Sequence, residues 1–187
     1  MRPLDRLERA KSRPAFVERM LRAALHDALG WRIGGGRAPS AESFVTAAVA
    51  TARLNLAALD GSSGERSRTL AAVQRVGSRF AASALFRRLM HVPAARFLRL
   101  AGDPGDADVI VRDRRRRLHA VALTIEHDAF AASRIATRIA SVMPLPAGDR
   151  LMPVTVHVFS LATGHRLTFE RDVFEPAVDR SAAGWVA

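Results

Sequence analysis

The sequence predicts a mixed α/β fold in which helices come first and a mixed β-sheet follows, in the order αβββαββ. Three observations predict this class. Before about residue 93, apolar residues recur at the spacing of amphipathic helices. After that point, short apolar runs alternate with turn residues, as in strands. One helical segment, residues 129–143, separates the third run from the fourth and therefore allows a crossover and a parallel strand pair.

Three helices are expected in the N-terminal half: residues 14–29, 40–59 and 66–90. Ser12 can cap the first of them, Pro14 suits its first turn, and Gly30 can end it. Ser40 is placed to cap the second helix, and Pro93 lies just beyond the end of the third. The three consecutive glycines at 34–36 favour a flexible loop after the first helix.

Five strands are expected in the C-terminal half: residues 96–102, 106–113, 118–126, 152–161 and 165–174. The first three are close enough in sequence to form a meander, with an arginine-rich turn between the second and third. We expect residues 1–39 to form an N-terminal helix with a Gly-rich linker and residues 40–175 to form the α/β domain. Residues 176–187 read as a C-terminal tail, small and polar apart from Trp185.

Composition bounds the function. The chain has no cysteine, which excludes disulfides and thiolate metal sites, and no apolar run long enough to predict a membrane span. The N-terminus lacks the apolar core of a signal peptide, so the cytoplasm is the expected location. The net charge is +11, and Lys11 is the only lysine among 29 basic residues. Such a surplus attracts polyanions, so nucleic acid, with DNA as the expected form, is the predicted partner. A basic surface that docks an acidic protein is the alternative.

The arginines expected to contact phosphate fall into three groups. Those of the third predicted helix follow one face, with Ser83 filling a gap in the row, and no glutamate is interleaved to neutralise them. The others lie in the turn between the second and third strands and on the helix at 129–143. The full set is Arg68, Arg75, Arg79, Arg87, Arg114, Arg115, Arg116, Arg117, Arg134 and Arg138. An ordinary solvated polar face is the alternative interpretation of each row.

The segment "GDADVIVRDRRRRLHAVALTIEHD", residues 105–128, places an acid at the head of one apolar strand and a second apolar strand after the turn. Together with the order of elements, this resembles the restriction-endonuclease-like, or PD-(D/E)XK, superfamily. The pattern is most similar to small bacterial Holliday-junction-resolvase-like proteins, in which a Gly-acid-x-Asp strand, an Arg-Asp turn and a "VEVK" strand follow one another. The resemblance covers residues 96–160 in element order and about 105–126 in residue identity.

The resemblance implies a phosphodiester-cleaving site, and the chemistry explains its residues. Mg²⁺ takes hard oxygen ligands, so two carboxylates must converge from adjacent strands to activate water. Asp108 matches the first metal-binding Asp, and Asp106 shares its face. Ala122 stands where the family has Glu, and Thr124 stands where it has Lys. Glu126 has the same strand parity and is the remaining candidate for a second metal ligand. Glu42 of the second helix could also approach the sheet.

Three hypotheses follow. The first is a catalytically degenerate nuclease-like domain that binds nucleic acid with arginines and needs no cofactor. The second is an active Mg²⁺-dependent DNA endonuclease or resolvase, in which Asp108 and Glu126 hold the metal and Thr124 assists. The third is a basic accessory subunit that docks an acidic protein. Among the histidines, His157 and His165 are expected to approach each other across the last hairpin.

Overall fold

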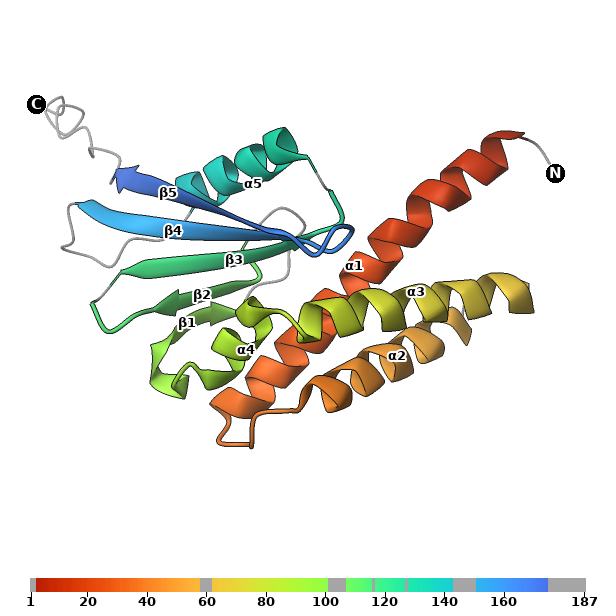
Figure 1. Ribbon diagram of the computed structural model, residues 1–187, viewed down its shortest axis with the longest axis horizontal. Helices are drawn as coiled ribbons and strands as arrows, with labels where there is room; N and C mark the ends of the chain where they lie inside the picture. The colour runs from red at the N-terminus through yellow and green to blue at the C-terminus, as the bar shows by residue number, and fades with distance from the viewer. Residues whose placement is uncertain are drawn as a thin grey trace, which may run out of the picture.

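The computed structural model describes residues 3–57, 62–100, 107–115, 117–126, 128–142 and 151–174, which form a layered α/β structure (Figure 1). The helices are α1 (Pro3–Ile33), α2 (Ala41–Ala57), α3 (Ser63–Ala81), α4 (Ala84–His91) and α5 (Ala129–Val142), with a 3₁₀ turn at Ala94–Arg96. The strands are β1 (Phe97–Leu100), β2 (Val109–Arg112), β3 (Leu118–Thr124), β4 (Leu151–Ser160) and β5 (Arg166–Phe174). The prediction of a mixed α/β fold with a mixed sheet is confirmed.

The sheet has the strand order β1-β2-β3-β4-β5. Neighbouring strands run antiparallel except for β3 and β4, which are parallel and are joined through α5. In this register Val121 of β3 lies opposite Val109 of β2 and His157 of β4. A parallel pair needs a crossover long enough to hold a helix, and the segment between β3 and β4 supplies one.

Helices cover both faces of the sheet, α1–α4 on one side and α5 on the other (Figure 1). On β3, Val121 and Leu123 belong to the core formed with α1–α4, whereas Ala120 and Ala122 belong to the core formed with α5. Successive side chains of a strand point to opposite faces, so a strand covered on both sides is apolar throughout. This alternation decides which residues of β3 can meet any given helix.

The third predicted helix is two helices. Ser83 separates α3 from α4, because its backbone is extended and its hydroxyl accepts a hydrogen bond from the Phe86 amide at 3.1 Å. Ser83 is therefore an N-cap and not a gap in an arginine row. Arg87 lies on α4, whereas Arg68, Arg75 and Arg79 lie on α3.

The first helix extends past Gly30, which was expected to end it, and continues to Ile33. A glycine inside a helix costs about 1 kcal/mol relative to alanine, so tertiary contacts must hold this last turn. Leu29 is fully buried, and the Arg32 guanidinium donates to the carbonyls of Met90 at 2.7 Å and Val92 at 2.8 Å. The end of α1 is thus attached to the end of α4.

The buried residues of α1 between 16 and 29 lie in one hydrophobic core with α2–α4 and the sheet. This stretch of α1 therefore packs in the same core as the helices and strands that follow it. The predicted tail, including Trp185, lies outside the described residues. In the described part of the chain, no helix combines the length and the apolar character needed to cross a bilayer.

Candidate functional site

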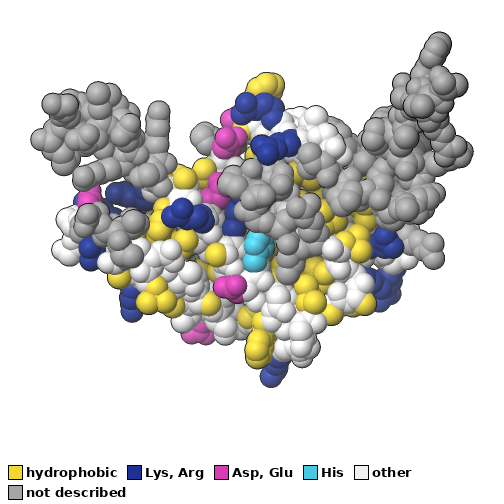
Figure 2. All heavy atoms as spheres, turned by 180° about the vertical axis from the view of Figure 1, so that it is seen from behind, with side chains coloured by type: hydrophobic (Ala, Val, Ile, Leu, Met, Phe, Trp, Pro, Cys, Tyr) yellow, Lys and Arg dark blue, Asp and Glu magenta, His cyan; other side chains and the backbone are white. Residues whose placement is uncertain are grey.

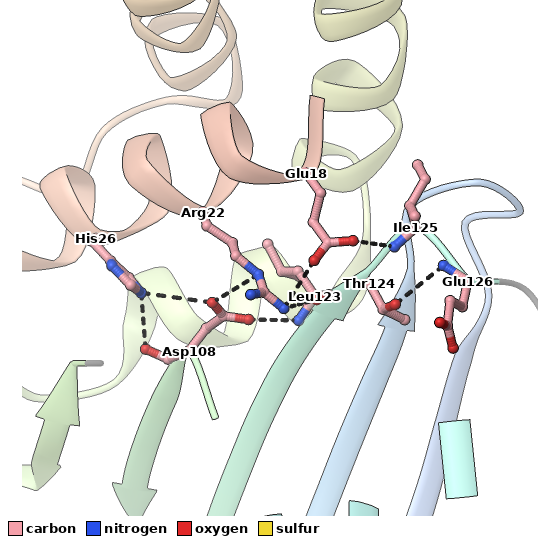
Figure 3. Close-up of polar contacts among 8 residues, drawn as sticks. All are labelled: Glu18, Arg22, His26, Asp108, Leu123, Thr124, Ile125 and Glu126. Carbon is pink, nitrogen blue, oxygen red and sulfur yellow. Dashed lines mark hydrogen bonds and ion pairs between the residues drawn. The ribbon is translucent and has the colours of Figure 1, made fainter. Parts of the chain in front are cut away.

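A polar row on α1 meets the ends of β2 and β3 on the α1–α4 side of the sheet (Figure 3). Its members, Glu18, Arg22 and His26, are spaced four residues apart, which places them on one face of the helix. Arg22 and His26 contact Asp108, the residue just before β2, and Glu18 contacts Ile125, the residue just after β3. This row is the polar centre of an otherwise apolar helix face.

Arg22 is the hub of the cluster. It is only 8% exposed. Its Nη2 donates to the Leu123 carbonyl at 2.5 Å and lies 3.1 Å from Glu18 Oε1. Its Nε lies 3.2 Å from Asp108 Oδ1. A buried guanidinium needs paired charges around it, and two carboxylates supply them here.

Asp108 is 1% exposed. Its Oδ2 accepts a hydrogen bond from the Leu123 amide at 2.7 Å, and its own amide donates to the Val121 carbonyl at 2.7 Å. Burial raises the pKa of Asp108 to about 7, while the Arg22 charge and the Leu123 amide act to lower it. Both oxygens of this carboxyl therefore face groups of the protein itself.

Glu18 repeats the same arrangement one step along the strand. Its Oε2 accepts a hydrogen bond from the Ile125 amide at 2.7 Å. β2 begins at Val109, which lies opposite Val121. The amides of Leu123 and Ile125 therefore lie beyond the stretch that β2 pairs with. Buried backbone amides require acceptors. The two carboxylates take the place of a neighbouring strand for this last stretch of β3.

His26 completes the row from the side of β2. Its Nε2 lies 3.1 Å from the Asp108 carbonyl oxygen and 3.8 Å from Asp108 Oδ1. Burial lowers the pKa of His26, and the Arg22 charge adds to this, while the hydrogen bond to the Asp108 backbone opposes it. The ring therefore acts as a neutral hydrogen-bonding partner of the Asp108 backbone.

The structure does not bring Asp108 together with Thr124 and Glu126. Thr124 is 5% exposed, and its hydroxyl accepts a hydrogen bond from the Glu126 amide at 3.1 Å. Both residues line a cavity of about 240 Å³ beside α5, together with Asp128 and His165. Asp108 lies on the α1–α4 side, so the expected pairing across one face is wrong. The alternation of β2 would place Asp108 on the side of Ile110, in the core under α5. Asp108 instead lies in a bend just before β2, and its carboxyl meets Arg22 on the α1–α4 side.

The other expected acidic residues do not complete a metal site. Glu42 is exposed in the first turn of α2, a helix that packs against α1 and α3. Asp106 lies outside the described residues. Ala122, at the position where the resemblance expects Glu, is buried in the core under α5. Within the described ranges, no three His, Asp or Glu side chains are grouped so that they could hold a metal ion.

The predicted phosphate-binding arginines that the structure describes are all exposed, but they lie on both sides of the sheet. Arg68, Arg75, Arg79 and Arg87 belong to α3 and α4, and Arg134 and Arg138 belong to α5 on the opposite side. Figure 2 shows the back of the molecule, where Lys and Arg side chains are spread among hydrophobic and acidic ones. One flat ligand therefore cannot contact all the predicted arginines.

The arginine-rich turn is ordered by Asp113. Its Oδ1 accepts hydrogen bonds from the amides of Arg115 at 2.7 Å and Arg117 at 2.9 Å. Although burial acts to raise the pKa of Asp113, these amides and the His119 ring lower it below its ordinary value. Arg114, Arg115 and Arg117 are exposed around this turn, and Arg116 lies outside the described residues.

A histidine pair crosses the sheet, and it is not the expected one. His119 of β3 and His157 of β4 have parallel rings with centroids 5.5 Å apart, and His119 Nδ1 lies 3.3 Å from His157 Nε2. His165 lies instead at the cavity beside α5. The parallel register of β3 and β4 brings the pair together, and no local pattern in the sequence reveals that register.

Comparison of the chain with protein-family models, with curated proteins and with solved structures finds no match. The function must therefore be inferred from the geometry. Two features carry chemical information: the buried cluster of Glu18, Arg22 and Asp108, and the exposed arginines around α3, α4 and the β2–β3 turn.

Proposed function

We propose that this protein binds nucleic acid, with DNA as the first candidate, through exposed arginines on the α3–α4 side of a nuclease-like scaffold that does not cut. The observation that carries the proposal is the contact of Arg22 with Asp108. The acid that the resemblance assigns to a metal is bound instead by a guanidinium of the same chain. The cluster stabilises the fold, and the arginines at the surface bind the ligand.

The arrangement around the central hairpin supports a restriction-endonuclease-like scaffold. β1, β2 and β3 form an antiparallel meander, α5 crosses over, and β4 pairs parallel to β3. Asp108 stands at the head of β2, beside the second strand of the hairpin. The resemblance rests on this succession of strands and crossover helix and on an acid at the head of the second strand. A fold alone does not give a function, so the case depends on the residues.

The geometry disfavours the Mg²⁺-dependent endonuclease. Mg²⁺ needs oxygen ligands that converge on one point and leave room for water. Here the Arg22 guanidinium lies against both Asp108 and Glu18, and a second cation at that point would be repelled. Glu126 faces the other side of the sheet. We therefore expect nucleic-acid binding that needs no metal ion.

Phosphate binding follows from charge and exposure. The net charge of +11 creates a field that attracts a polyanion. The guanidinium group of arginine can donate two parallel hydrogen bonds to a phosphate group. Arg75, Arg79 and Arg87 on α3 and α4 are exposed. Contacts of this kind position a protein on the phosphate backbone without reading its sequence.

Fluorescence anisotropy with a labelled DNA duplex tests the proposal. If about six phosphates are contacted, affinity should fall about a thousandfold between 50 and 200 mM salt. The triple variant Arg75→Gln, Arg79→Gln, Arg87→Gln should bind more weakly and with a shallower salt dependence. Duplex RNA and single-stranded DNA in parallel identify the preferred form. Absence of duplex binding at 50 mM salt, or binding that salt does not weaken, would refute the proposal.

A cleavage assay separates the proposal from the endonuclease alternative. Supercoiled and branched DNA incubated with Mg²⁺ or Mn²⁺ should remain intact. Cleavage by the parent protein that is lost in a folded Asp108→Asn variant would establish the nuclease instead. Co-purification of an acidic protein, without nucleic-acid binding, would favour the accessory-subunit alternative.

A further inference from the structure

We propose that Arg88, Arg166 and the pair His119–His157 form a phosphate-binding site on the part of the sheet beside α4. This inference rests on the proposed function, because the phosphate would be one of the nucleic-acid backbone. It adds four residues to those that the sequence indicated, and it makes binding dependent on pH.

A chain of polar contacts crosses the sheet at this place. Asp113 Oδ2 lies 3.4 Å from His119 Nε2, and the other ring nitrogen of His119 lies 3.3 Å from His157 Nε2. His157 Nδ1 lies 3.2 Å from the hydroxyl of Thr168 on β5. Each imidazole thus has both nitrogens in contact with a polar group, which fixes the orientation of both rings.

Two arginines from different elements lie beside this row of polar contacts. Arg88 lies on α4 and Arg166 begins β5, where it pairs with Phe159 on the α1–α4 side of the sheet. Burial, together with the charges of His119, Arg166 and Arg88, lowers the pKa of His157 to about 4. Guanidinium groups from α4 and β5 therefore act on one half-buried ring.

The remaining charged groups around His157 are few among the described residues. Asp113 lies at the far end of His119, and Glu170 on β5 lies opposite Thr155, on the same face, with interactions of its own. Arg79 of α3 donates to the Ala162 carbonyl in the adjoining β4–β5 turn and extends the basic surface. Arg88 and Arg166 are exposed, so their guanidinium groups can reach a ligand in solution.

A phosphate group is the ligand that this chemistry fits. Its negative charge would offset the repulsion between Arg88 and Arg166, and its oxygens accept from the guanidinium N–H groups. The same charge would favour the protonated form of His157 and raise its pKa in the complex. Phosphate binding and proton uptake are then linked, so affinity should increase as the pH falls from 7.5 to 5.5.

Paired charge-matched variants test the site. Arg88→Gln with Arg166→Gln should weaken duplex binding about tenfold at 100 mM salt and reduce the salt slope by about two. The control, Arg134→Gln with Arg138→Gln, removes the same charge from α5 on the opposite side of the sheet and should weaken binding about twofold. Circular dichroism verifies that both variants fold. Equal losses in the two variants, with the parent protein binding DNA, would overturn this site and leave the proposed function standing.

Imidazole NMR on the unmodified protein gives a second measurement that needs no variant. Inorganic phosphate, and separately the DNA duplex, should each raise the pKa of His157, while the signals of His91, exposed at the end of α4, serve as the reference. If phosphate raises this pKa but the duplex does not bind, the site stands and nucleic acid is the wrong source of the phosphate. If phosphate leaves the pKa of His157 unchanged, the site is refuted.

Discussion

Replacing Arg22 by methionine should destabilise the protein by about 3–5 kcal/mol at pH 8. Methionine keeps an apolar side chain of similar length but removes the guanidinium that contacts Asp108, Glu18 and the Leu123 carbonyl. Breaking a buried ion pair by removing one partner costs about this much, because the other charge remains in the interior. Domains of this kind are stabilised by only about 5–15 kcal/mol, so the effect would be large.

The pH dependence of this loss identifies its cause. The folded-state pKa of Asp108 is about 7, above its ordinary value of 3.8, and Arg22 acts to lower it. Without Arg22 this pKa rises further, so the folded variant keeps the carboxyl protonated at pH 8, where the parent protein ionises it beside Arg22 and the unfolded chain ionises it in water. At pH 5, below the folded-state pKa of both proteins, the carboxyl is protonated in both folds and this part of the loss disappears. At pH 5 the remaining loss is that of charge-assisted hydrogen bonds, about 1.5–3 kcal/mol.

Urea unfolding followed by circular dichroism at pH 5 and pH 8 measures both values. Arg19→Met is the matched control, because Arg19 is exposed on the same helix and its guanidinium lies over the Phe16 ring. This variant should lose less than about 0.5 kcal/mol of the free energy of unfolding. The double variant Arg22→Met, Asp108→Asn should recover part of the loss at pH 8. A cost for Arg22→Met below about 1 kcal/mol, or one that is equal at both pH values, would refute a structural role for the pair.

Three further outcomes are expected. Ser83→Ala should cost about 1 kcal/mol in urea unfolding, since it removes the cap of α4, and no loss would mean that the break between α3 and α4 is held by packing alone. The pKa of His157 is about 4 in the folded protein and 6.5 in the unfolded chain, so this histidine makes the free energy of unfolding rise with pH between those values. His157→Gln should remove this contribution. An unchanged slope of the free energy of unfolding across pH 4–6.5 would contradict the prediction. Gly164→Ala should cost about 1–2 kcal/mol because φ is +79° there. The matched change Gly30→Ala should stabilise by about 0.5–1 kcal/mol, because Gly30 is exposed within α1 and an added Cβ there meets nothing within 4 Å; the opposite order of these two effects would contradict the geometry.

Much of the local structure could be predicted. The hydroxyl of Ser40 accepts a hydrogen bond from the Ser43 amide at 3.0 Å, as expected of the cap of the second helix. The runs at 118–126 and 152–161 correspond to β3 and β4 within two residues at each end. These features depend on neighbours along the chain, so a single sequence contains the information. The break at Ser83 was missed because an apolar row continues through it at helical spacing, and the cap is visible only once Phe86 is known to be buried against α2 and α3.

The site shows the limit of the same reasoning. The acid at the head of β2 is readable from the sequence, but its partners are not. Asp108 meets Arg22, 86 positions earlier in the numbering, because α1 packs over the end of β3. The expected partner Glu126 lines the cavity beside α5, whereas the Asp108 carboxyl accepts from the Leu123 amide on the α1–α4 side. Asp108 lies in a bend before β2, so the alternation of side chains along the strand does not fix its direction.

By itself the sequence determined the order of helical and extended segments, the approximate ends of β3 and β4, the absence of cysteine and the surplus of arginine. The tertiary structure alone decided which face each side chain takes. In the folded protein Asp108, the expected metal ligand, pairs with the buried Arg22. The exposed arginines lie on both sides of the sheet, and the rings of His119 and His157 stack. The physical reason is range: helix periodicity, caps and turns act over a few residues, whereas strand register and helix docking are set by burial among segments far apart in the chain.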